Sequence, residues 1–237
     1  MSEQQKHFPE FYVTAPQACP YLAGRLERKL FTHLTHDKPR ALIDNLLKGG
    51  FRRSQNIAYM PYCEGCQACV SVRVLVNEFE ANRAQRRALQ RHGALEPRPA
   101  ELKFNGEHYA LYRLYQGERH RGGGMDHDSR EQYAHFLLQS NVATRLIEFR
   151  EGGELRMVSI VDELADGLSS VYTFFDPLVA QASYGTFNIL WQIEEAKRRG
   201  LQYVYLGYWI GQSRKMSYKN QFKPIEGLSR GEWKRLA

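Results

Sequence analysis

Three strand-like segments in a row constrain the fold of this chain more than any other feature of its sequence. They cover residues 144–150, 154–164 and 168–176. The pairs Gly152-Gly153 and Asp166-Gly167 separate them, and such pairs are typical of tight β-hairpin turns. The sequence therefore predicts an antiparallel meander of three strands.

A helix and one more strand are expected after the meander, at 183–200 and 201–210. Short links on both sides of a helix favour a parallel crossover. Two helices are expected before the meander, at 106–120 and 128–140. The order of helix, helix, three strands, helix and strand is typical of GCN5-related N-acetyltransferase (GNAT) domains. The sequence therefore predicts an α+β chain whose second part is GNAT-like, with a mixed sheet.

The first part of the chain carries a different pattern. A short helix is expected at 37–49, a strand with alternating valines at 71–79, and a basic helix at 82–93. The two prolines within 95–102 interrupt this pattern, so we expect a domain boundary there. The predicted division is an N-terminal domain at 1–98, which contains the cysteines, and a GNAT-like domain at 99–237.

Three of the four cysteines form a C-x-x-C-x-x-C run, Cys63, Cys66 and Cys69, and the fourth is Cys19. Four thiolates suffice for a tetrahedral zinc ion or a four-iron cluster, and the spacing does not choose between them. Buried thiols or a redox pair are the alternative reading. No organic cofactor is expected, because the turn before the last long helix lacks the glycine pattern that binds the pyrophosphate of coenzyme A.

The chain is basic, with 33 Lys and Arg residues against 26 Asp and Glu and a net charge of +7. A basic surface favours phosphate-rich partners. Arg83, Arg86 and Arg87 lie on the predicted basic helix, and His120 and Arg121 precede three glycines in "RHRGGGMD". Both groups suit contacts with a phosphate backbone; a solvated helix face and a flexible loop are the alternatives.

Residues 205–224 combine aromatic side chains with cations. The aromatic candidates are Tyr205, Tyr208 and Tyr218, and the cationic ones are Arg214, Lys215 and Lys219. Aromatic rings beside cations suit a nucleotide base or an aminoacyl group with a neighbouring carboxylate or phosphate. The alternative is a C-terminal strand and loop that pack on the core. The sequence contains no convincing Ser/His/Asp triad.

Several of these motifs occur together in one family. "CPYLAGR", "YMPYCEGCQACVSVRV", "RHRGGGMD" and "YLGYWI" followed by "RKMSYKNQFKP" resemble the bacterial aspartate/glutamate leucyltransferases, relatives of the eukaryotic arginyl-tRNA–protein transferases. The resemblance extends over nearly the whole chain. It implies transfer of leucine from Leu-tRNA to the N-terminal α-amino group of proteins that begin with Asp or Glu, which marks them for degradation.

The residues and the resemblance together suggest roles. The acidic N-terminus needs a cation, expected from Arg214, Lys215 or Lys219. Tyr205, Tyr208 or Tyr218 is expected near the ester, and the residues expected at tRNA are Arg83, Arg86, Arg87, His120 and Arg121. The alternatives are arginyl transfer, acetyl transfer from coenzyme A, and a non-catalytic, metal-containing tRNA-binding module. We expect a cytoplasmic protein without a membrane span, since no apolar run is long enough.

Overall fold

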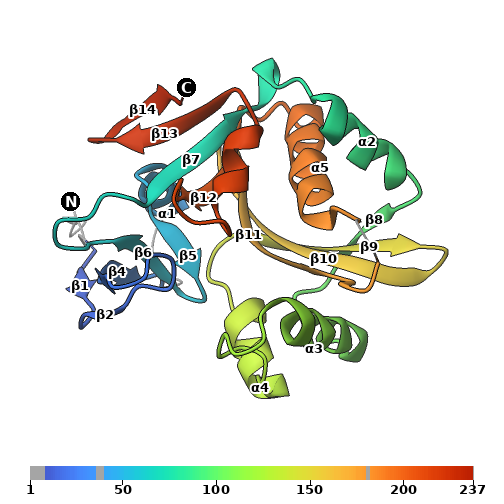
Figure 1. Cartoon of the computed structure of the whole chain (residues 1–237), viewed down its shortest axis with the longest axis horizontal. Coiled ribbons are helices and arrows are strands. Elements are labelled where there is room, and N and C mark those ends of the chain that lie inside the picture. The colour runs from blue at the N-terminus through green and yellow to red at the C-terminus, as the bar shows by residue number, and fades with distance from the viewer. Residues whose placement is uncertain (1–8, 36–39, 180–181, 237) are drawn as a thin grey trace, which may run out of the picture.

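A computed structural model describes residues 9–35, 40–179 and 182–236 of the chain. It is an α+β structure with an eight-stranded mixed sheet and a smaller four-stranded sheet (Figure 1). Its helices are α1 (Arg40–Lys48), α2 (Arg83–Arg91), α3 (Gly106–Arg119), α4 (Arg130–Tyr133) and α5 (Tyr184–Arg198). Helices α2 and α5 lie on one face of the large sheet and α3 and α4 on the other (Figure 1). The predicted α+β class with a mixed sheet is confirmed.

The large sheet has the strand order β14-β13-β7-β12-β11-β10-β9-β8. Its strands are β7 (Val70–Leu75), β8 (Glu96–Ala100), β9 (Thr144–Glu151), β10 (Glu154–Glu163), β11 (Gly167–Phe175), β12 (Tyr203–Trp209), β13 (Ile225–Ser229) and β14 (Glu232–Arg235). Strands β9, β10 and β11 form the predicted antiparallel meander. Strand β12 then pairs with β11 in parallel, after the crossover through α5. Both predictions are confirmed.

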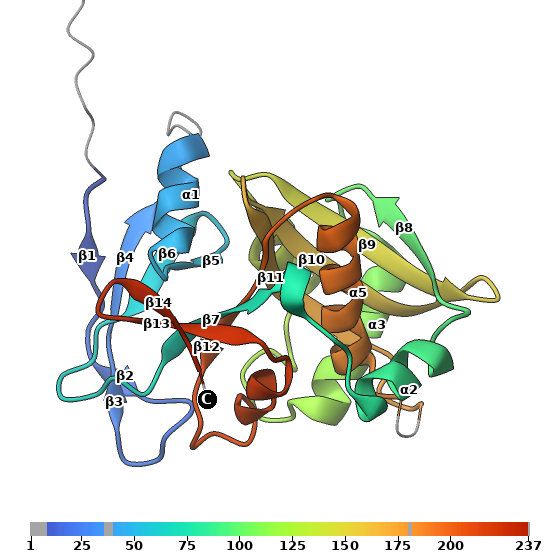
Figure 2. The same ribbon diagram turned by 90° about the horizontal axis from the view of Figure 1, so that it is seen from above.

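The small sheet has the order β1-β4-β6-β5 and lies beside α1 (Figure 2). Its strands are β1 (Tyr12–Val13), β4 (Lys29–His33), β5 (Arg52–Ser54) and β6 (Ile57–Pro61), and β2 (Gln17–Ala18) pairs separately with β3 (Leu26–Glu27). Buried residues of α1 include Ile43 and Leu47, and they share a hydrophobic cluster with Ala58 of β6. The start of the predicted helix, residues 37–39, lies outside the described residues.

The large sheet continues across the predicted boundary between residues 98 and 99. Strand β7, from the first part, lies between β12 and β13 of the second part. Its Val72 and Val74 are fully buried in the main hydrophobic cluster with residues of α5. The proline-containing segment expected to be a boundary is instead the edge strand β8, where Pro97 and Pro99 are tolerated because one side of the strand has no partner.

Local sequence signals explain the helices that cover the large sheet. Helix α2 begins with a capping box of Asn82 and Gln85. A capping box of Ser129 and Gln132 begins α4, which continues as a π-helical turn over Ala134–Leu138. Helix α5 is followed by Gly200 in the left-handed region. Among the described helices, none has the length and apolar character needed to cross a bilayer.

Strands β11 and β12 separate part of the way along their length. Their parallel pairing ends at Ser169 and Tyr205, although β11 continues to Phe175 and β12 to Trp209. The pairing of β12 with β7 shifts in register between Tyr205 and Gly207. A bulge of this kind bends a strand away from its neighbour. Strands β11 and β12 therefore diverge beyond Ser169 and Tyr205.

A buried ion pair joins the two sheets. Arg53 of β5 donates through Nε and Nη2 to the two carboxylate oxygens of Asp162 on β10, at 2.6 and 2.8 Å. Both side chains are almost completely buried, with 2% and 1% exposure. The hydroxyl of Thr144 also donates to Asp162, at 2.6 Å. A buried charge is tolerated when it is paired and fully hydrogen-bonded in this way.

Replacing Arg53 with Met should destabilise the protein strongly, because Asp162 would remain as an unpaired buried charge. We expect a loss of about 3–5 kcal/mol in the free energy of unfolding, measured with urea. The control is Arg145→Met, since Arg145 is 39% exposed beside Glu163 and such a pair contributes about 0–1 kcal/mol. Equal effects of the two substitutions would contradict the proposed role of the pair.

Candidate functional site

The hydroxyls of two predicted catalytic tyrosines are engaged in the fold. Tyr205 donates to Asp166 at 3.2 Å and accepts from Arg73 at 3.3 Å. Burial raises its pKa. The hydroxyl of Tyr208 lies 2.9 Å from the carbonyl oxygen of Gly50 and 3.1 Å from that of Tyr59. Tyr208 therefore links the end of β12 to the small sheet.

Lys219 lies beneath the end of β12 and not on the surface. It belongs to the 3-10 helix Ser217–Gln221, is 8% exposed, and donates from Nζ to the backbone oxygen of Tyr208 at 2.7 Å. Burial, together with the nearby charge of Arg52, lowers the pKa of Lys219 to about 7. Of the three cations predicted to meet the acidic substrate, Lys219 is the buried one, whereas Arg214 and Lys215 are exposed.

The structure brings His120, predicted to contact tRNA, close to residues predicted to contact the acceptor and the ester. His120 follows α3, and its ring nitrogen lies 3.2 Å from the hydroxyl of Tyr115. Burial lowers the pKa of His120, with a smaller effect from the charge of Lys215. Tyr218 is 39% exposed and interacts electrostatically with Tyr115. We call His120, Lys215 and Tyr218 the rim cluster.

The other residues predicted at tRNA lie in two places. Arg83, Arg86 and Arg87 are exposed on α2, which packs beside α5. Arg121 is exposed in the loop after α3, on the opposite face of the sheet (Figure 1). In that loop the backbone N–H of Gly122 donates to Asp126 at 2.8 Å. The structure therefore does not gather these residues on one surface.

The four cysteines line one cavity of about 70 Å³, together with Tyr21, Tyr59 and Tyr208 among others. All four are free thiols. Burial and the neighbouring thiols raise the pKa of Cys69 to about 11. A backbone hydrogen bond from Ala68 lowers the pKa of Cys66, as does Arg25, whose Nη1 lies 3.2 Å from the sulfur.

The cysteine cavity bears on the predicted metal in two ways. Four thiols around one cavity provide the donor chemistry that zinc and iron–sulfur clusters use. Within residues 9–35, 40–179 and 182–236, however, no group of three or more His, Cys, Asp or Glu side chains is spaced closely enough to hold a metal ion. The four thiols therefore have the right chemistry for zinc or an iron–sulfur cluster, but their positions do not form a coordination sphere.

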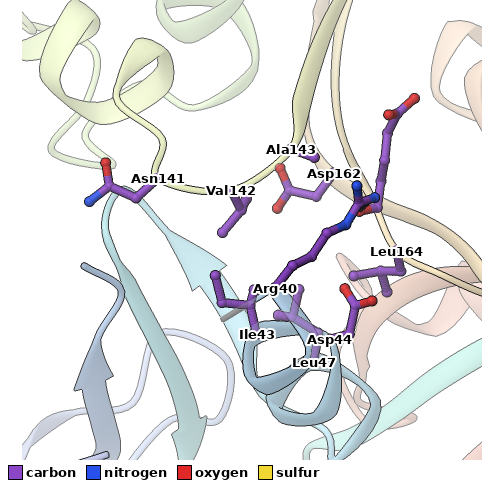
Figure 3. Close-up of a pocket in the computed structure, with 10 residues that line it drawn as sticks. Arg40, Ile43, Asp44, Leu47, Asn141, Val142, Ala143, Asp162 and Leu164 are labelled. Atoms are coloured by element: carbon purple, nitrogen blue, oxygen red, sulfur yellow. Dashed lines mark hydrogen bonds between the residues drawn. The ribbon is translucent and has the colours of Figure 1, made fainter. Parts of the chain in front are cut away.

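A second cavity, of about 140 Å³, lies between α1 and the end of β10 (Figure 3). Arg40 reaches across it towards the backbone oxygen of Glu163, at 3.4 Å. Asp44 accepts from the backbone N–H of Ala165 at 3.1 Å. None of the residues predicted for catalysis or binding lines this cavity. It lies at the joint between the two sheets, beside Asp162, and we assign it no chemistry.

Sequence reasoning missed Arg52, the neighbour of the buried Arg53. Its guanidinium lies where β11 and β12 diverge and donates to the hydroxyl of Ser169 at 2.9 Å and to the backbone oxygen of Ser170. The only signal in the sequence is the pair of arginines in "GGFRRS". That pair cannot show which arginine lies next to which strand.

Comparisons with known proteins agree on one family. The family description "Arginine-tRNA-protein transferase, N terminus" matches residues 17–87, and "Arginine-tRNA-protein transferase, C terminus" matches 107–229. The aspartate/glutamate leucyltransferase of Thiobacillus denitrificans is 54% identical over 96% of this chain and 95% of its own. That of Nitrosospira multiformis is 52% identical over 96% and 90%.

Among solved structures, L-PGS from Bacillus licheniformis is similar at 12% identity and a TM-score of 0.49, covering 68% of this chain and 59% of that chain. A likeness this remote supports no argument about the present chain.

The stability of a Lys219→Met variant, relative to the wild type, should depend on pH. The pKa of Lys219 is about 7 in the folded protein against 10.5 ordinarily, so between these values the unfolded chain holds more protons. The destabilising effect of the buried charge is complete below about pH 7 and disappears as the pH rises towards about 10. Lys219→Met should therefore gain most stability in acid and least in alkali.

Urea unfolding of both proteins at about pH 6 and about pH 9.5 measures this difference. Lys215→Met is the matched control, because Lys215 is exposed and its replacement relieves no burial. A stability gain for Lys219→Met that was the same at both pH values would show that the lysine is not held in a desolvated position.

Proposed function

The chain belongs to the arginine-tRNA-protein transferase family, and we propose that it transfers leucine from leucyl-tRNA to the α-amino group of proteins beginning with Asp or Glu. Family membership makes it an aminoacyltransferase with an aminoacyl-tRNA donor and a protein acceptor. The names of relatives that match it over nearly their full length support leucine as the transferred group and acidic N-termini as the acceptors. This observation carries the proposal.

The reaction needs positioning more than strong acid–base chemistry. The amine nitrogen attacks the ester carbonyl, the bond to the terminal ribose oxygen breaks, and an amide forms as the amine loses its proton. The ester is already activated, and an α-amino group with a pKa near 8 is partly neutral at pH 7. We place the reaction where β11 and β12 diverge, as in the expected GNAT-like arrangement. We propose a cytoplasmic location, which an aminoacyl-tRNA donor supports.

Among the three candidate tyrosines, we favour Tyr218 for proton relay to the leaving oxygen. The hydroxyls of Tyr205 and Tyr208 are already engaged with Asp166, Arg73 and backbone oxygens. Tyr218 is 39% exposed in the rim cluster. Arg214 and Lys215, both exposed beside it, attract the acidic N-terminus. An exposed ion pair is weak, so Lys215→Ala should slow transfer only several-fold.

Two basic surfaces are proposed to hold the tRNA. Arg83, Arg86 and Arg87 on α2 suit a phosphate backbone, and so do His120 of the rim cluster and Arg121, the next residue in the chain. Each phosphate contact that is lost should reduce the salt dependence of binding. Replacing Arg86 and Arg87 by Ala should therefore lower the slope of log Kd against log salt; an unchanged slope would remove α2 from the interface.

We also propose that Cys19, Cys63, Cys66 and Cys69 hold a zinc ion or an iron–sulfur cluster. The support is that all four thiols line one cavity. Such a group would join the N-terminal segment to β6 and β7, as expected of a cysteine-containing N-terminal domain. Elemental analysis of protein purified without oxygen tests this proposal, and protein free of zinc, iron and sulfide would contradict it.

The donor assay separates the proposed function from its alternatives. The protein is incubated with a peptide beginning with Asp and with Leu-tRNA, Arg-tRNA or acetyl-coenzyme A, and the peptide is weighed by mass spectrometry. We expect addition of one leucine from Leu-tRNA and no other product. A gain of arginine or of an acetyl group would identify the other donors.

The same assay is applied to the variant Tyr218→Phe. We expect its rate of transfer to fall while its affinity for Leu-tRNA is kept, because only the relay hydroxyl is removed. Wild-type protein that bound Leu-tRNA and modified no peptide would instead indicate a non-catalytic tRNA-binding module.

A further inference from the structure

The side chain of Arg52 occupies a space beside Gly207 of strand β12. Strand β12 bulges between Tyr205 and Gly207 as it leaves β11, and Gly207 has a φ of +75°. A Cβ atom at Gly207 would lie 2.7 Å from Nε and 2.9 Å from Cζ of Arg52. Such contacts would displace the guanidinium, and together with the positive φ they favour glycine where Arg52 lies against β12.

Contacts on the other side of the guanidinium fix its orientation. Nη1 donates to the hydroxyl of Ser169 at 2.9 Å, and Nη2 donates to the backbone oxygen of Ser170. These are the residues of β11 at which its pairing with β12 stops. Arg52 reaches them from β5 of the small sheet (Figure 2). The guanidinium therefore lies between the two diverging strands, hydrogen-bonded to β11 and close to Gly207 of β12.

The charge of Arg52 is not balanced within the part of the chain that the structure describes. Its two acceptors are neutral, and they use two of its five N–H groups. No carboxylate there forms an ion pair with it, whereas Arg53 has Asp162 and Arg73 has Glu226. A second cation, Lys219, is close enough for Arg52 to lower its pKa, in addition to the larger effect of burial. The site is half-buried and positive, with donors left for an anion.

We propose that Arg52 binds the side-chain carboxylate of the acceptor's N-terminal Asp or Glu and so determines acceptor specificity. This inference rests on the proposed function. A planar guanidinium matches a carboxylate through two parallel hydrogen bonds, and a permanent anion offsets the cost of a half-buried cation. The position between β11 and β12 would bring the α-amine of the same residue to the place where the ester is attacked. Arg214 and Lys215 then attract the substrate, and Arg52 selects it.

The experiment compares two peptides that differ only in their first residue, Asp or its neutral counterpart Asn. With Leu-tRNA as donor, kcat/KM is measured for both peptides with wild-type protein, Arg52→Gln and Arg145→Gln. We expect Arg52→Gln to lower the ratio of Asp to Asn by about 10- to 100-fold, mainly through the KM of the Asp peptide. The control Arg145→Gln, at a partly exposed position on β9, should keep the wild-type ratio. The Kd of each protein for Leu-tRNA should stay the same.

Both peptides are measured with the same protein preparation. Partial unfolding of a variant therefore lowers both rates equally and leaves the ratio of Asp to Asn unchanged. An unchanged ratio for Arg52→Gln would overturn the inference. An equal fall in kcat for both peptides would assign Arg52 to the transition state instead, and a weaker Kd for Leu-tRNA would assign it to a phosphate.

If Arg52→Gln modifies neither peptide, Arg52→Lys decides the question. Lysine keeps the charge but cannot form two parallel hydrogen bonds with a carboxylate. The ratio of kcat/KM for the Asp and Asn peptides should therefore fall to an intermediate value, and a wild-type ratio would reject the proposal. Wild-type protein that transfers leucine to neither peptide would contradict the proposed function itself, and the inference with it.

Discussion

The buried ion pair between Arg53 and Asp162 determines where the small sheet sits on the large one, and the candidate site depends on that placement. Asp162 on β10 pairs in register with Ser169 on β11. Consecutive arginines of β5 therefore contact neighbouring strands at the same level: Arg53 is neutralised by Asp162, and Arg52 reaches Ser169 and Ser170. Losing the pair would remove the contact that fixes β5 directly on β10, beside the point where Arg52 meets β11.

Two aromatic residues connect the cysteine cavity to the strands around Arg52. Tyr59 and Tyr208 line the cavity, and their rings lie 6.3 Å apart. Tyr59 is also the partner of Arg52 in the pairing of β5 with β6. The backbone oxygen of Tyr208 accepts a hydrogen bond from Nζ of the buried Lys219. A metal or cluster on the cysteines would thus stabilise the strand pair that presents Arg52. The role that we propose for the cysteines is therefore to support the edge of the site, separate from the chemistry of acyl transfer.

Local patterns made the meander, the crossover and the capped helices predictable, because hairpin turns and caps are determined by residues close in sequence. The central position of β7 was not predictable, since alternating valines show that a strand is half-buried but not which strands it joins. In the sequence alone the prolines of β8 indicate a boundary, because edge pairing is also a long-range property. In the site, the aromatic and basic segment at 205–224 was recognised, yet its sequence could not show that Tyr208 would be engaged by the small sheet. Nor could "FRRS" distinguish Arg53, which Asp162 neutralises, from Arg52, which has no carboxylate partner among the described residues.

The central claim is that an acidic N-terminus is held between the diverging strands by a guanidinium from the small sheet. The most direct test is a crystal structure of the protein with a bound peptide that begins with Asp. The account predicts that the side-chain carboxylate lies about 3 Å from the Nη atoms of Arg52, with the α-amine between β11 and β12. A peptide whose carboxylate contacts only Arg214 or Lys215, or that occupies the cavity beside α1, would contradict it.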